Sequence, residues 1–267
     1  MNINNIYKIS IKEIKYNISN YWIFLSAFIF TALNFIIIYF SEIITGDYSQ
    51  TDTRALLLSI IHLQMYLIPL LSFILSYDSI LSEKEFGILD LILSYRISFI
   101  DILFGKLIGN TIVFIIAFFL GFLPVIIYLV LLGVSILILI KFLFITFWLS
   151  FIFNSFAIYI SSVSGNRTTV ISLSIFIWLF FIFIYDILFI FITTMFDGNF
   201  FSDILGFLLF FNPAQIFRLL SLFYFMPLDI NDLFGIDVGV LKFIYIIISM
   251  FIWVFAVIFG FFCIKNK

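Results

Sequence analysis

Long apolar runs, separated by short polar segments, dominate the chain. Six such runs lie at approximately 21–41, 56–77, 107–132, 137–161, 170–192 and 239–263. A helix needs about 20 apolar residues to cross the hydrocarbon core of a bilayer, so each run is long enough. Lipid offers no partners to unpaired backbone groups, and unbroken runs of this length therefore indicate helices rather than barrel strands. The pattern predicts an all-α membrane protein with about six transmembrane helices.

Residues 1–20 follow a different pattern, with apolar and polar positions that both recur at helical spacing. The apolar series is Ile3, Tyr7, Ile11, Ile14 and Ile18, and the polar series is Asn5, Lys8, Lys12, Lys15 and Ser19. Two such faces predict an amphipathic helix in the membrane interface. A basic leader that only follows the positive-inside rule is the alternative, and the two readings are compatible. No small-residue cleavage site follows, so we expect a retained first helix rather than a signal peptide.

Composition supports a membrane protein. Hydrophobic residues make up 65% of the 267 residues and charged residues only 10%, against about 25% charged in a soluble domain. The net charge of −2 does not favour nucleic-acid binding. The single cysteine, Cys263, excludes an internal disulfide and reads as an apolar filler. The single histidine, His62, excludes a site with several histidines in one chain.

Basic residues are distributed unequally between the two sides of the predicted bundle. If the N-terminus is inside, the inner side holds Lys8, Lys12, Lys15, Lys84, Arg96, Lys106, Arg167, Lys265 and Lys267. The outer side holds Arg54, Lys141, Arg218 and Lys242. This bias predicts cytoplasmic termini for a single transmembrane domain over residues 21–267.

The longest predicted cytoplasmic segment, residues 78–106, begins with an amphipathic stretch. Its charged positions Glu83, Lys84, Glu85 and Asp90 alternate with the apolar positions Ile80, Leu81, Ile88, Leu89, Ile92 and Leu93. Gly87 interrupts the stretch and indicates a bend or a close backbone contact. A solvated connector is the alternative, but it would leave the apolar residues in water. We therefore expect protein or membrane to cover them.

An acidic segment at about 193–238 is predicted on the outer side, and it contains a helix start. Asn212 can accept hydrogen bonds from first-turn amides, and Pro213 suits the first helical position. The apolar stripe that follows is Ile216, Leu219, Leu220 and Phe223, while Gln215 and Arg218 lie on another face. This pattern predicts an interfacial or re-entrant helix. Arg218 is then expected to face an approaching partner or to pair with an acid such as Asp229 or Asp232.

Motifs for catalysis are missing from the sequence. No G-x-x-x-x-G-K-[ST] occurs, since Gly105-Lys106 is followed by Leu107 and Ile100 stands at the first glycine position. One histidine cannot form H-E-x-x-H, and no membrane segment pairs two acids. We therefore predict no enzymatic activity and no cofactor bound by this chain. A secondary transporter, with broken spans in two repeated halves, is not indicated.

Two positions inside the apolar runs could carry function. Asp186 lies in the fifth run, where an acid is a candidate for translocation or gating, or for a structural contact with Lys141 or Asn34. His62 and Met65 lie three residues apart and share a helix face, so they are weak candidates for soft-metal contact. Two weak ligands do not make a metal site.

The order of these segments resembles the permease subunits of type-2 ABC exporters over essentially the whole chain. Two local stretches are similar to the branch that serves nitrous oxide reductase maturation. The first runs from Tyr77-Asp78 through Glu83, Gly87 and Leu89 to Gly105-Lys106 and Gly109, and the second is Asn212-Pro213-Ala-Gln-Ile-Phe-Arg-Leu-Leu.

The resemblance implies a multi-pass protein of the bacterial inner membrane. It implies a homodimer with cytoplasmic ATPase subunits that bind ATP-Mg and with a periplasmic maturation protein. It assigns ATPase coupling to Glu83, Lys84, Glu85, Phe86, Gly87, Leu89 and Asp90, and periplasmic docking to Asn212, Pro213, Gln215 and Arg218. The expected cargo is a copper- or sulfur-related species. With one Cys and five Met, the chain has few soft ligands for a copper relay. An exporter of another substrate and a membrane scaffold for a periplasmic maturation factor are the alternatives.

Overall fold

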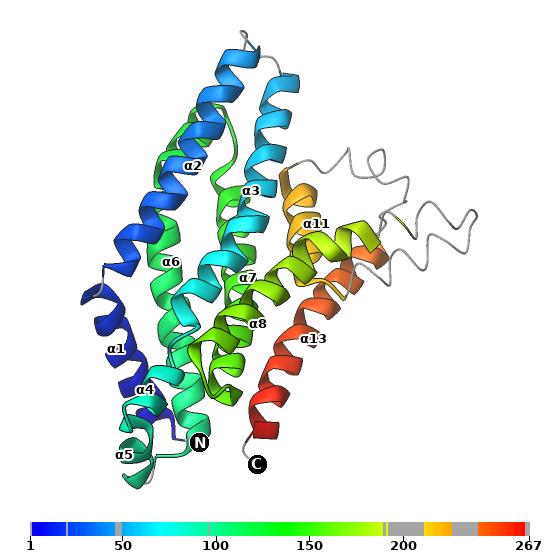
Figure 1. Ribbon diagram of the computed structural model, residues 1–267. Helices are drawn as coiled ribbons and strands as arrows, with labels where there is room; N and C mark the ends of the chain where they lie inside the picture. Colours follow the sequence, from blue (N-terminus) through cyan, green and yellow to red (C-terminus); the bar gives the residue numbers. More distant parts are fainter. Residues whose placement is uncertain are drawn as a thin grey trace.

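The computed structural model is a bundle of long helices. It describes residues 2–19, 21–45, 50–95, 97–188, 191, 211–225 and 240–264, and within these ranges it contains no strand. The first residues of α1 (Ile3–Ser19) and the last residues of α13 (Val240–Ile264) lie at the same end of the molecule (Figure 1). The predicted all-α class is confirmed.

The spanning helices correspond to the apolar runs. They are α2 (Trp22–Thr45), α3 (Gln50–Ser76), α6 (Phe99–Leu131), α7 (Ile136–Val163) and α8 (Arg167–Leu179), which continues into the π-helix η1 (Phe180–Ile184). Five spans in the described ranges are long and apolar enough to cross a membrane. The helix α13 has 25 residues and contains a shorter apolar stretch, Ile248–Phe262. The helix α6 begins at Phe99, well before the expected start near 107.

The helices α1 and α2 lie one after the other along α6, and both run parallel to it. Glycines on α6 make the contact close. A Cβ atom on Gly105 would lie 2.7 Å from the Cβ of Ile9, and one on Gly121 would lie 2.6 Å from the Cβ of Phe30. Small residues allow helix backbones to approach in this way, which increases dispersion contacts. The first half of the chain is therefore built around α6.

A chain of aromatic rings fills the centre of the bundle. Phe30 of α2 meets Phe118 of α6 edge-on with ring centroids 4.9 Å apart, and Phe118 stacks on Phe122 at 5.0 Å. Phe142 of α7 then contacts Phe217 of α11 (Pro213–Phe225) at 5.7 Å. Tilted and edge-on ring pairs of this kind are favourable. The rings connect α11 to the core of the bundle.

Buried polar side chains inside the bundle bond across helices. Gln64 of α3 donates to Asn34 of α2 at 3.0 Å, and Ser76 of α3 donates to Asn154 of α7 at 2.8 Å. Such pairs satisfy polar groups that lipid cannot. Asn34, which we expected as a partner of Asp186, is thus bonded to another helix.

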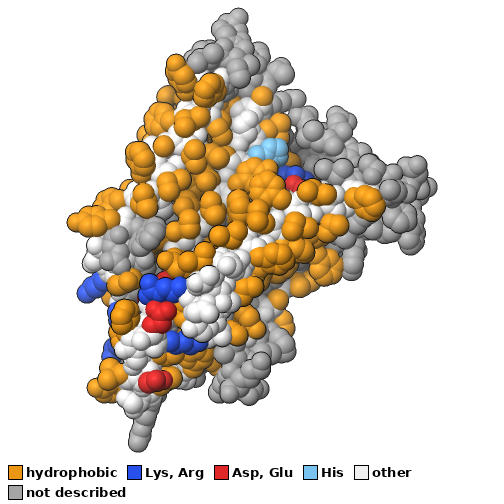
Figure 2. Space-filling model, viewed as in Figure 1, with side chains coloured by type: hydrophobic (Ala, Val, Ile, Leu, Met, Phe, Trp, Pro, Cys, Tyr) orange, Lys and Arg blue, Asp and Glu red, His pale blue; other side chains and the backbone are white. Residues whose placement is uncertain are grey.

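Side-chain type changes along the molecule. Figure 2 shows hydrophobic side chains over most of the visible face and charged side chains gathered mainly at the end that carries α4 and α5. Large apolar residues with free surface occur on several helices, among them Phe28 of α2, Phe144 of α7 and Phe251 of α13. An apolar exterior of this extent suits contact with lipid.

Candidate functional site

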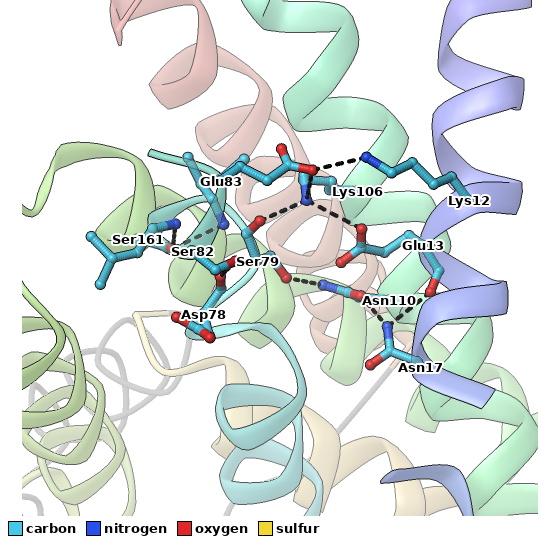
Figure 3. Close-up of polar contacts among 12 residues, drawn as sticks. Lys12, Glu13, Asn17, Asp78, Ser79, Ser82, Glu83, Lys106, Asn110 and Ser161 are labelled. Atoms are coloured by element: carbon cyan, nitrogen blue, oxygen red, sulfur yellow. Dashed lines mark hydrogen bonds and ion pairs between the residues drawn. The ribbon is translucent and has the colours of Figure 1, made fainter. Parts of the chain in front are cut away.

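A buried charge network joins α1, α6 and the short helix α4 (Leu81–Glu85), as Figure 3 shows. The Lys106 Nζ lies 3.2 Å from Glu13 Oε2 and 3.2 Å from Glu83 Oε1. It also donates a hydrogen bond of 2.6 Å to the backbone oxygen of Ser79. One lysine on α6 thus connects the N-terminal helix to the segment that leads into α4.

The network is electrically balanced. Lys106, Glu13 and Glu83 have side-chain exposures of 4%, 8% and 11%, so their charges are removed from water. Lys106 alone would leave one negative charge, and Lys12 supplies the second positive charge at 3.2 Å from Glu83 Oε1. Buried charges persist when they are paired and hydrogen-bonded. Lys106, Glu13 and Glu83 are paired in this way, and the mostly exposed Lys12 completes the charge balance, while Glu83 Oε2 has no hydrogen-bond partner among the described residues.

Neutral side chains extend the network towards the middle of the bundle. Asn110 of α6 donates 2.7 Å to Ser79 Oγ, and Asn17 of α1 donates 3.1 Å to Asn110 Oδ1 (Figure 3). Asn110 and Lys106 lie four residues apart, so one face of α6 presents both side chains. The connection between α3 and α4 is therefore bonded to α6 through Ser79.

The start of α4 is held by α7. The backbone amides of Ile80 and Leu81 donate to Ser161 Oγ at 3.2 and 3.0 Å. Ser161 therefore satisfies two amides that have no partner within the short helix. Ile80 and Leu81 are also buried, which adds apolar packing to the same contact.

The end of α4 is bonded to α7 and α8. The Arg167 Nε, at the start of α8, donates 2.9 Å to Glu85 Oε2 and lies 3.8 Å from Asp78 Oδ1. Lys84 Nζ donates to the backbone oxygen of Ser162 near the end of α7. The helix α4 is consequently bonded on one side to α1 and α6 and on the other to α7 and α8.

Beyond α4 the chain turns at Gly87 and forms α5 (Ile88–Ser94). Gly87 has φ 69°, in the left-handed region that favours glycine, as its interruption of the sequence pattern predicted. Ile88, Leu91 and Tyr95 share one face by their spacing and are 40%, 60% and 73% exposed. The structure thus presents an apolar α5 face at the end of the molecule where the charged side chains gather.

The predicted ATPase-coupling residues divide into two groups. Phe86, Gly87 and Asp90 are exposed, as a docking contact requires. Glu83 and Leu89 are buried, and Lys84 and Glu85 are bonded to α7 and α8. These four side chains hold the segment to the bundle, although Glu85 remains exposed, and the role of the segment in ATPase coupling stays a prediction.

A second polar cluster joins the end of the fifth span to α11. Gln215 Nε2 donates to Asp186 Oδ1, and Arg218 Nη1 lies 3.9 Å from Asp186 Oδ2. Arg218 Nε and Gln215 Oε1 are buried without hydrogen-bond partners in the described part of the chain. Lys141, the other expected partner of Asp186, instead lies over the ring of Tyr224 at 4.8 Å. Asp186 is therefore in contact with α11.

The predicted start of α11 is confirmed. Asn212 Oδ1 accepts from the Ala214 amide at 2.9 Å, and Pro213 is the first residue of the helix. Asn212 Nδ2 also donates 2.6 Å to the backbone oxygen of Phe181, inside η1. A π-helix bonds its backbone groups five residues apart, and here the side chain that precedes α11 bonds to a carbonyl within that turn.

The predicted docking residues face inward. Asn212, Pro213 and Gln215 are buried, and only 17% of the Arg218 side chain is exposed. Arg218 therefore pairs with Asp186 instead of pointing at an approaching partner. Asp229 and Asp232, its expected alternatives, lie outside the described residues. The docking role of this segment stays a prediction.

The two weak metal candidates differ in their surroundings. Met65 is fully buried in the core, whereas His62 is exposed, within electrostatic range of Asp186 and Arg218. Figure 2 shows the histidine beside charged atoms in an otherwise apolar region. In the described residues no group of three or more His, Cys, Asp or Glu side chains could hold a metal ion.

Sequence reasoning did not identify Glu13, Asn17 and Asn110 as site residues. Glu13 stands in a basic helix, and Asn110 lies next to Gly109 on a strongly apolar run. A single acid in a basic helix and an amide beside a glycine in a membrane span were the available signals. They indicate buried pairing only once α1 and α6 are known to be parallel neighbours.

Comparison with known proteins agrees with this architecture. Residues 7–265 match the family described as ABC-2 family transporter protein. A protein of Stutzerimonas stutzeri, named probable ABC transporter permease protein NosY, is 28% identical over 226 residues, which cover 82% of each chain. The protein of the same name from Pseudomonas aeruginosa is 26% identical over 227 residues, or 81% of each chain.

The matched residues include most of the N-terminal helix α1, the spans, the short helices α4 and α5, and α11. The chain is accordingly a multi-pass protein of the bacterial inner membrane. It belongs to the ABC-2 transporter family, as a permease subunit.

Proposed function

We propose that this chain is the permease of an ABC exporter that serves assembly of the copper–sulfur centre of nitrous oxide reductase, moving a copper- or sulfur-related species. An ABC permease works with an ATPase subunit, and the chain itself lacks a phosphate-binding loop. The observation that supports the specific pathway is the similarity to two NosY permeases over about four fifths of the chain.

The exposed face of α5 is the proposed contact with the ATPase. It consists of Ile88, Leu91 and Tyr95, with Phe86 exposed to 72% just before the turn. Isolated apolar residues are common on surfaces, but a contiguous apolar face at an otherwise charged end suits protein contact. The bonds of α4 to four other helices would carry a displacement of α5 into the bundle.

The proposed complex contains two further components. A second copy of the chain would complete the transport route, and a periplasmic maturation protein would receive the cargo near α11. The inward pairing of Arg218 with Asp186 favours a role at the outer end of the route over direct contact with that protein.

Deletion of the gene tests the pathway. We expect nitrous oxide reductase from the deletion strain to lack the absorption of its copper–sulfur centre, and wild-type copies to restore it. A fully loaded reductase in the deletion strain would contradict the assignment and leave an ABC-2 exporter of another substrate. Co-expression with an ATPase whose P-loop lysine is replaced by alanine separates export from scaffolding, because only a scaffold would still support maturation.

A further inference from the structure

The helix α1 presents three different faces. Its buried face packs against α6 and consists of Ile6, Ser10, Glu13 and Asn17. A neighbouring face carries exposed apolar side chains, with Ile3, Tyr7 and Ile18 at 80%, 62% and 46% exposure. Lys8, Lys12 and Lys15 follow at spacings of four and three, which places them opposite the buried face at 100° of rotation per residue.

Most of the positive charge on this lysine face is unpaired. Lys8 and Lys15 form no ion pair with any residue that the structure describes. Lys12 contributes only partly to the internal network, since its side chain is 60% exposed while its Nζ contacts Glu83. Three cations thus lie along one line on the surface, beside an apolar strip.

We propose that the lysine face of α1 binds the phosphate groups of anionic phospholipids. The exposed apolar strip provides the insertion into the acyl region, and the lysines lie beside it, at the depth of the headgroups. Charge complementarity selects the lipid class: the face has three cations, and Glu83 is its one acidic neighbour within 4.0 Å among the residues that the structure describes. A zwitterionic headgroup offers no net charge to such a row.

Lys12 gives the lipid site a connection to the interior. Its contact with Glu83 balances the buried network, so a phosphate group at this position competes with Glu83 for the same ammonium. Lys12 should therefore contribute less to lipid binding than Lys8 or Lys15. This ordering distinguishes a site that shares a residue with the network from a uniform basic surface.

The test is a lipid titration of the full-length protein in neutral detergent. The rise in Tm on addition of phosphatidylglycerol reports the apparent affinity, with phosphatidylcholine and soluble sn-glycerol 3-phosphate as parallel arms. We expect a rise with phosphatidylglycerol alone, weakened by added salt. The variants Lys8→Gln and Lys15→Gln should each weaken the apparent affinity roughly fivefold, and Lys12→Gln less.

The matched control is Lys141→Gln, which removes an exposed lysine from α7. It should leave the lipid response unchanged, and neither Lys8→Gln nor Lys15→Gln should change the Tm without lipid by as much as the lipid does. Equal responses to the two phospholipids, or unchanged affinity in Lys8→Gln and Lys15→Gln, would overturn the proposal. An equal rise with glycerol phosphate would replace the lipid with a free phosphate. The assay needs no ATPase, so its failure would leave the proposed transport function untouched.

Discussion

Lys106 has contacts that its position in the sequence does not reveal. It occurs in Gly-Lys within the predicted cytoplasmic segment, where a cation would ordinarily be solvated. In the structure it is buried on α6 between Glu13 and Glu83. Its role is to join three helices that are distant in sequence.

Replacement of Lys106 by methionine should destabilise the protein strongly. The variant keeps the apolar stem but leaves Glu13 and Glu83 buried with only Lys12 nearby. Removal of one partner from a buried ion pair typically costs about 3–5 kcal/mol. We expect a clearly lower Tm in detergent for Lys106→Met than for Lys141→Met, which changes an exposed lysine. Equal Tm values for the two variants would show that the network adds no stability.

The Asp186–Arg218 pair permits a double-mutant cycle. Arg218→Met alone leaves a carboxylate that is bonded only to Gln215, whereas Arg218→Met with Asp186→Leu removes both charges. Because an uncompensated charge is the costly state, the double variant should be more stable than the sum of the single effects predicts. We expect a coupling energy of about 0.5–3 kcal/mol. Strict additivity in thermal unfolding would mean that the two charges do not interact.

Residue roles were predictable from the sequence where the signal was local. The Asn212-Pro213 start and the turn at Gly87 follow from backbone chemistry within a few residues. The destination of Glu83, Arg218 and Asp186 depends on which helices become neighbours. The sequence alone does not show which helices pack against each other. These side chains were therefore expected to face outward or to pair elsewhere.

At the scale of elements, the contact of α1 with α6 depends on small residues. A Cβ on Gly109 would lie 2.8 Å from Glu13 Cβ and 3.0 Å from the backbone oxygen of Ser10. The larger side chain could be accommodated only by displacement of α1. That displacement would also move Glu13 relative to Lys106.

Gly109→Ala is therefore expected to destabilise the protein by about 1–3 kcal/mol, as overpacking usually does. Gly165→Ala is the matched control, since a Cβ at that position meets nothing within 4 Å. Thermal unfolding of both variants in the same detergent measures the difference. A Gly109→Ala protein as stable as Gly165→Ala would show that α1 has room to move away from α6 at no cost.

Element type followed directly from hydrophobic periodicity, whereas element limits did not. The long apolar runs predicted the spanning helices, since only helices satisfy the backbone in lipid. The start of α6 lies at Phe99, with Ser98 accepting from the Asp101 amide, and the polar side chains that follow bond to other parts of the protein: Asp101, Lys106 and Asn110. A hydropathy pattern places such residues outside a span, although the helix continues through them.

At the scale of the whole molecule, the apolar exterior and the charged end define one direction. The helices α1, α4 and α5 and the buried network lie at the end where both described termini are found (Figure 1). The Asp186 cluster lies away from that end, where α11 meets the fifth span. The permease fold thus places a proposed ATPase contact and a proposed outer gate in different parts of the bundle.

We propose that ATP-driven motion enters the bundle through the exposed face of α5. Co-purification of the permease with its ATPase subunit, followed by measurement of ATP hydrolysis in nanodiscs, tests this contact. Leu91→Asp places a charge in the middle of that face, and Leu131→Asp places the same charge at the opposite end of α6. We predict that Leu91→Asp lowers recovery of the ATPase about tenfold while Leu131→Asp leaves it unchanged, with both permease variants folded. Full recovery of the ATPase with Leu91→Asp would show that the α5 face does not bind the ATPase.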